Sequence, residues 1–118
     1  MNEDFLHYVW KFQLLSIHDL KTTTKESLLV LKTGIHNYNS GPDFLNAQLK
    51  IKNQLWVGNI EIHLKSSDWY VHNHEVDPNY DAVILHVVWE DDLPVFMRNN
   101  NPLPVLILKD FVFNSALN

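Results

Sequence analysis

Apolar and polar residues alternate along two neighbouring stretches in the middle of the chain. In residues 44–52, every second side chain from Leu45 to Ile51 is apolar and the side chains between them are polar. The alternation returns in residues 55–65, after a tight connection at Asn53-Gln54. Because strand side chains point alternately to the two faces of a sheet, these stretches predict a half-buried β-hairpin.

Other apolar segments predict one helix and three more strands. Residues 4–15 place apolar side chains near helical spacing, which predicts a short amphipathic helix. Two short β-prone runs, at residues 28–32 and 105–109, predict strands. Residues 82–89 are almost continuously apolar, which is typical of a strand covered on both faces.

Polar segments separate these elements. They predict loops at residues 33–41, at residues 66–81 with a helical turn, and at residues 94–104 with three prolines. The element order predicts an α+β fold: a mixed central β-sheet of about five strands, with an N-terminal helix and one short helix or loop on a face. Residues 1–118 contain no repeat and no linker, which predicts a single domain.

Composition and charge narrow the classes of function. The chain has no cysteine, so disulfides and thiolate metal sites are excluded. A net charge of −5 argues against a protein that binds DNA only through a positively charged surface. It argues less against a metal nuclease, because the bound cation offsets the negative charge of the carboxylates in the site. No signal peptide and no apolar run of roughly 20 residues is recognisable, so we expect a cytoplasmic protein without a membrane partner.

Candidate chemistry begins in the second strand of the hairpin. Glu61, His63 and Lys65 share one face of this strand, spaced about 6.5–7 Å apart, while Ile60 and its alternate neighbours face the core. If the hairpin closes near residue 53, Asp43 falls roughly level with residues 61–65. Two carboxylates and an imidazole suit Mg²⁺, Mn²⁺ or Zn²⁺, and no organic cofactor is indicated.

Three further histidines extend this candidate site. His72 and His74 point to the same side of an extended segment, a spacing that suits a transition metal. His86 lies inside the apolar strand and would approach Glu61 or His63 if the two strands pair.

Each candidate also has a structural interpretation without metal. Glu61 and His63 would then lie on a solvated strand face or share a hydrogen bond, and Lys65 would be an exposed strand end. The other interpretations are a turn for Asp43, exposed loop positions for His72 and His74, and a buried, hydrogen-bonded side chain for His86.

Two families resemble parts of this pattern. Asp43, the hairpin and Glu61-x-His63 resemble the core of the PD-(D/E)XK nuclease superfamily, which implies metal binding by Asp43 and Glu61. In that superfamily a lysine two residues after the glutamate assists the nucleophile. Here His63 stands at that position and Lys65 comes two residues later, which puts the catalytic role in doubt.

The second resemblance covers about residues 5–110. The segments GPDFLNA, GNIEIHLKSSDWYVHNH and VILHVV resemble the N-terminal part of an uncharacterised bacterial family whose domain has no known function. Members of that family are usually longer, which implies that this chain is an N-terminal domain or fragment.

Three functions stay open at this point. The first is a divalent-metal-dependent nuclease or phosphodiesterase with Asp43, Glu61, His63 and Lys65 in the catalytic site and nucleic acid as partner. The second is a non-enzymatic interaction module that presents Trp56, Trp69 and Tyr70 to a second copy of the chain or to the C-terminal remainder of a longer chain. The third is a structural zinc site built from His72, His74 and either His63 or His86.

Overall fold

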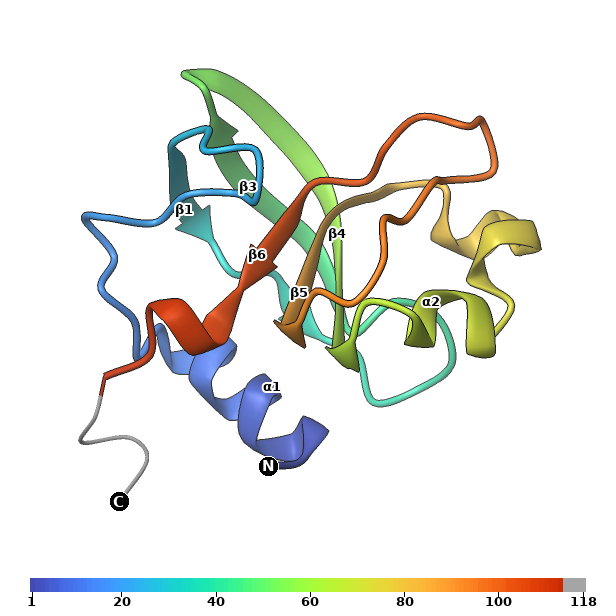
Figure 1. Cartoon of the computed structure of the whole chain (residues 1–118), viewed down its shortest axis with the longest axis horizontal. Coiled ribbons are helices and arrows are strands. Elements are labelled where there is room, and N and C mark those ends of the chain that lie inside the picture. The colour runs from blue at the N-terminus through green and yellow to red at the C-terminus, as the bar shows by residue number, and fades with distance from the viewer. Residues whose placement is uncertain (114–118) are drawn as a thin grey trace.

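The computed structural model describes residues 1–113, which form one curved mixed sheet with helices on its faces (Figure 1). The sheet order is β1-β3-β4-β5-β6, with β2 paired to β3. Strands β1 to β4 pair antiparallel, whereas β4, β5 and β6 run parallel, so the predicted mixed sheet is confirmed. The strands are β1 (Leu28–Lys32), β2 (Ile35–His36), β3 (Phe44–Ile51), β4 (Gln54–Lys65), β5 (Val83–Glu90) and β6 (Val105–Ile107).

The helices are short. Helix α1 (Glu3–Phe12) is capped by the side chain of Asn2 and ends at Gln13, whose φ of 50° breaks the helix before residue 15. The predicted loop at residues 66–81 contains α2 (Asp68–Val71) and two 3₁₀ turns, and a third 3₁₀ turn follows β6. The described residues include no helix that is long and apolar enough to cross a membrane. The 3₁₀ turns are η1 (His74–Val76), η2 (Pro78–Tyr80) and η3 (Leu108–Asp110).

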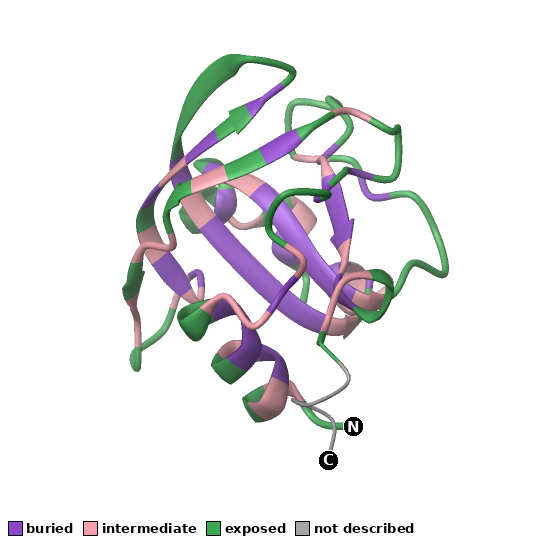
Figure 2. Cartoon of the chain, turned by 90° about the vertical axis from the view of Figure 1, so that its left-hand side faces the viewer, coloured by how far each residue is buried: buried purple, intermediate pink, exposed green. Residues whose placement is uncertain are grey.

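Both faces of β5 and of the C-terminal part of β4 are buried, whereas β4 begins with four exposed residues (Figure 2). On one face, Leu6 and Trp10 of α1 join Ile62 of β4 in the main hydrophobic core. On the other face, a smaller core contains Trp69 of α2 and Tyr80 of η2. The sequence correctly predicted that β5 is covered on both sides, but the burial of both faces of β4 was not predicted.

Two local predictions for the hairpin are wrong. Leu45 was expected to face the core, but Phe44 is buried and Leu45 is half-buried, because a bulge at Asn46 (φ 58°) shifts the alternation. The hairpin turn consists of Lys52 and Asn53, with φ of 52° and 65°, as in a two-residue turn of type I′.

Gly58 sets the approach of the two parallel strands that carry the site. A Cβ atom at this position would lie 2.5 Å from the Ala82 carbonyl oxygen and from Cγ2 of Ile84. Only glycine therefore lets β4 and β5 run this close, in the register that places Glu61 beside His86.

Candidate metal centre

Strand β4 supplies two buried polar side chains, Glu61 and His63. They lie on the face opposite Ile60 and Ile62, as the alternation predicts. Their exposed fractions are 4% and 1%, so the alternative of a solvated strand face is wrong. Buried polar groups require partners, and these come from the segment that covers this face.

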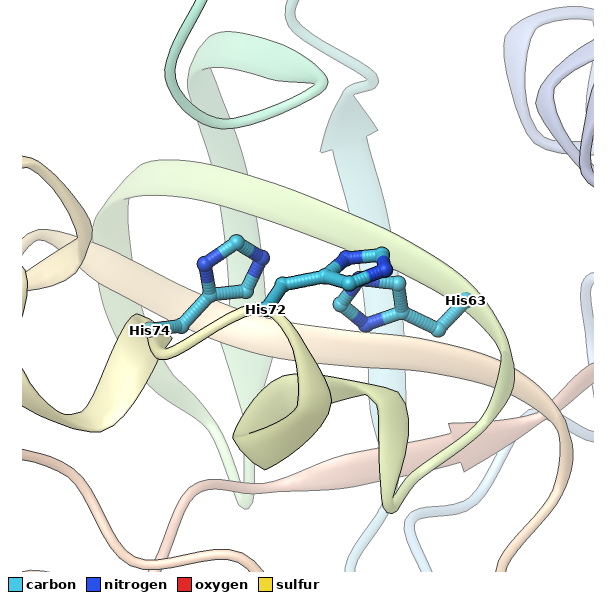
Figure 3. Close-up of side chains that lie close together, drawn as sticks. All are labelled: His63, His72 and His74. Carbon is cyan, nitrogen blue, oxygen red and sulfur yellow. The ribbon is translucent and has the colours of Figure 1, made fainter.

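The segment after β4 folds back over the strand and adds two imidazoles. Asn73, with φ of 59°, turns the chain between α2 and η1, so that His72 and His74 both lie near His63 (Figure 3). One nitrogen from each of these three rings can be chosen so that all lie within 4.8 Å of one another. His72 is exposed, as expected for a loop, whereas the same expectation for His74 is wrong because only 7% of it is exposed. We call His63, His72 and His74 the histidine cluster.

Aromatic packing fixes the ring of His74. The Tyr80 ring stacks on it at 3.7 Å with an interplanar angle of 17°, and the Trp69 ring meets it edge-on at 5.2 Å. Trp69 is 1% exposed, so it covers the sheet and is not presented to a partner. The imidazole is therefore held in one orientation before any ligand binds.

Glu61 lies between two rings of the histidine cluster. Its Oε2 atom is 2.7 Å from Nε2 of His74 and 3.4 Å from Nε2 of His63. Its Oε1 atom accepts a hydrogen bond from the backbone N–H of Asp43, and Oδ2 of Asp43 accepts one from the N–H of Ile62 at 2.8 Å. Asp43 thus bridges the ends of β3 and β4 and positions Glu61, rather than only shaping its own turn.

His86, on the neighbouring strand β5, contacts the His63 ring of the histidine cluster. It is fully buried, and its Nε2 atom lies 2.8 Å from Nδ1 of His63. If His63 offers a lone pair from Nε2, its Nδ1–H must donate to His86, which fixes the tautomer and the ring orientation. Lys65, in contrast, is exposed at the end of β4, where its backbone N–H donates to Asp68.

Burial determines the charge states in the site. Burial raises the pKa of Glu61 to about 10, and the Asp43 carboxylate beside it acts in the same direction. Burial lowers the pKa of His63 to about 2, that of His74 to about 4 and that of His86 to about 3, and neighbouring histidines contribute to each shift. Near pH 7 the imidazoles of His63, His74 and His86 are therefore neutral, which is the form that binds metal.

The donor set fits a transition-metal ion. Ligands of a tetrahedral zinc ion bound at about 2.0–2.1 Å lie about 3.3 Å apart, close to the 3.4 Å between Glu61 and His63. The nitrogens of His63, His72 and His74 are within 4.8 Å of one another, so the exposed His72 side chain would have to move closer to complete this geometry. Both ring nitrogens of the buried His74 lack a hydrogen-bond partner, although Nε2 lies 2.7 Å from a carboxylate oxygen. A cation held between Nε2 of His74 and this carboxylate oxygen would give Nε2 a partner.

These pKa shifts predict a stability maximum near pH 6.5 for the metal-free domain. Below pH 6.5, unfolding lets His63, His74 and His86 bind protons that their folded forms exclude, so stability falls as the pH falls. Between pH 4.5 and pH 10, unfolding releases the proton of Glu61, so this group lowers stability as the pH rises. Thermal unfolding in EDTA from pH 5 to pH 9 measures both the loss of stability on the acid side of the maximum and the loss on the alkaline side.

The Glu61→Gln variant separates the two causes. In this variant we expect the thermal midpoint to change little between pH 7 and pH 9, and still to fall below pH 6.5 as in the wild type. A midpoint that rises continuously to pH 9 in the wild type would show that Glu61 is ionised in the folded domain.

Sequence reasoning missed two histidines next to this site. Nε2 of His7, in α1, lies 3.6 Å from Oδ2 of Asp43, and its Nδ1 lies 3.3 Å from Nε2 of His36 in β2. Burial alone would lower the pKa of His7, but the hydrogen bond and the charge of Asp43 outweigh it and raise that pKa. The one signal in the sequence is that His7 interrupts the apolar positions of α1.

Comparison with known proteins identifies the family. Residues 3–118 match the family described as "Protein of unknown function (DUF2851)", and the chain belongs to it. The resemblance to an uncharacterised family is therefore confirmed. No curated protein and no solved structure was found to match the chain.

Proposed function

We propose that this member of the DUF2851 family binds a transition-metal ion, Zn²⁺ in the first place, through the histidine cluster, with Glu61 beside the ion. The observation that carries the proposal is that one nitrogen from each of three imidazoles lies within 4.8 Å of the others, and that two of these rings lie within 3.4 Å of the buried Glu61 oxygen. Imidazole donors suit zinc, and the neutral rings of His63 and His74 need no deprotonation before they bind.

We further propose that the centre is hydrolytic. Structural zinc sites are usually closed by four protein ligands and are rich in cysteine, whereas catalytic sites use three ligands and keep one position open. Here three histidines stand beside a carboxylate, and His72 lies at the surface. A bound zinc ion would supply Lewis-acid chemistry and lower the pKa of a water molecule.

The chain's own residues then have distinct roles. Glu61 would lose its own proton when the ion binds beside it, and its Oε2 atom then accepts a proton from the attacking water, because its Oε1 atom is already held by the Asp43 amide. Asp43 and His86 position Glu61 and His63 and do not themselves bind the ion. As the sequence resemblance implies, we propose a phosphodiester substrate. Lys65 would act only on a substrate group outside the cluster.

Hydrolysis of bis(p-nitrophenyl) phosphate and of a single-stranded oligonucleotide tests the proposal, with Zn²⁺, Mn²⁺ or Mg²⁺ added to EDTA-treated protein. We expect metal-dependent cleavage, reduced by about a hundredfold or more in Glu61→Gln. Glu90→Gln is the matched control, because this glutamate is exposed at the end of β5.

Two outcomes would contradict parts of the proposal. Cleavage that is equal in both variants would show that another group performs the reaction. If zinc raises the thermal midpoint but no substrate is cleaved, the centre has the structural role of the third sequence hypothesis.

A further inference from the structure

A groove of about 430 Å³ lies between α1 and the segment around β2. Two ridges of α1 form one side, with Tyr8 and Phe12 on the first ridge and His7 and Lys11 on the second. The opposite side contains His36 and Tyr38. The groove is distinct from the histidine cluster, although His7 connects the two through Asp43.

Aromatic rings line both walls of this groove. His36 stacks on the buried Phe44 ring at 4.6 Å and 18°, and Tyr38 lies over His36 at 4.2 Å. Tyr38 is nevertheless 78% exposed, while Tyr8 and Phe12 are 51% and 57% exposed on the facing wall. Three exposed rings on a rigid support form a stacking surface for a planar ligand.

Lys11 is the residue of this groove that can pair with an anionic group on that ligand. Lys11 is exposed on the helix, and His7 forms the end of the groove that faces Asp43. Asp4 is the acidic residue that lines the groove, one helical turn before Tyr8. A phosphate beside Lys11 and His7 would lie on the side of the groove that leads toward the proposed metal centre.

We propose that this groove binds an unpaired nucleotide of single-stranded nucleic acid, with its base against Tyr38 and its phosphate beside Lys11 and His7. Stacking on aromatic rings does not depend on the nucleotide sequence, because every base offers a flat face. In a duplex both faces of a base are covered by the stacked neighbouring base pairs, so duplex DNA is excluded from the groove. The role of the groove as a substrate site rests on the proposed function, but its binding of nucleotides does not.

Fluorescence anisotropy of labelled dT12 and rU12 tests the proposal in EDTA, where no metal contributes. Tyr38→Ala is expected to weaken binding by about tenfold or more, and Tyr38→Phe to preserve it. Lys11→Gln is expected to reduce the slope of log K against log salt by about 0.7, the value of one phosphate contact. Trp56→Ala and Lys50→Gln are the matched controls, because both residues are exposed and lie outside the groove.

Several results would overturn the proposal. They are absence of binding, equal affinity for duplex DNA, or equal losses in Tyr38→Ala and Trp56→Ala. His74→Ala separates this proposal from the metal proposal, because it should remove zinc binding and leave the affinity for dT12 unchanged. If zinc binding fails while dT12 still binds at Tyr38, only the proposed metal centre is wrong.

Discussion

Replacing His74 by alanine is expected to weaken zinc binding by at least about a hundredfold. Loss of an outer partner of a metal ligand already costs 10- to 100-fold, and His74 is proposed as a direct ligand. Its ring is held by Tyr80 and Trp69, so the wild type binds without ordering it first. Isothermal titration calorimetry with Zn²⁺ and a competing chelator measures the change.

Two further variants make this result interpretable. His18→Ala removes an exposed histidine outside the cluster and should bind zinc like the wild type. His72→Ala removes an exposed ligand without disturbing the core, so it should lose affinity and keep its thermal midpoint in EDTA. Unchanged affinity in both His72→Ala and His74→Ala would show that the histidine cluster does not bind zinc.

The second large effect is a rise in zinc affinity with pH. The raised pKa of Glu61, about 10, means that metal binding near neutral pH must displace its proton, whereas His63 and His74 are already neutral. Between pH 7 and pH 8.5 we therefore expect the zinc dissociation constant to fall about tenfold per pH unit, with release of about one proton. Titrations in buffers of different ionisation enthalpy count that proton.

The Glu61→Gln variant again provides the direct comparison. It carries no proton to displace, so its weaker affinity should be nearly independent of pH over the same range. Glu90→Gln should retain the wild-type slope. A wild-type affinity that does not change with pH would show that Glu61 is ionised before zinc binds or does not contact the ion.

Much of this arrangement follows from local sequence patterns. The period of two in residues 55–65 correctly placed Glu61 and His63 on one face of a strand, and the hairpin brought Asp43 level with Glu61. The continuous apolar run of β5 indicated a strand buried on both faces, and the pairing of β5 with β4, which the sequence prediction took as a condition, places His86 within reach of His63. These features depend on the geometry of single strands and hairpins, which the spacing of apolar and polar residues along the sequence predicts.

Other features depend on contacts between distant segments. The burial of His74 results from packing against Trp69 and Tyr80, and no pattern in a polar segment reveals such packing. His7 and His36 meet only because α1 crosses near β2, 29 residues away in sequence. The bulge at Asn46 was not predicted either. One residue in a left-handed conformation does not alter the alternation of apolar and polar residues in the sequence.

An anomalous difference map at the zinc absorption edge, from crystals of the zinc-loaded domain, tests the central claim most directly. The account predicts one zinc peak at about 2.0–2.1 Å from a nitrogen of each of His63, His72 and His74, with a Glu61 oxygen beside it. A peak bound elsewhere, or no peak at the histidine cluster in the presence of saturating zinc, would contradict it.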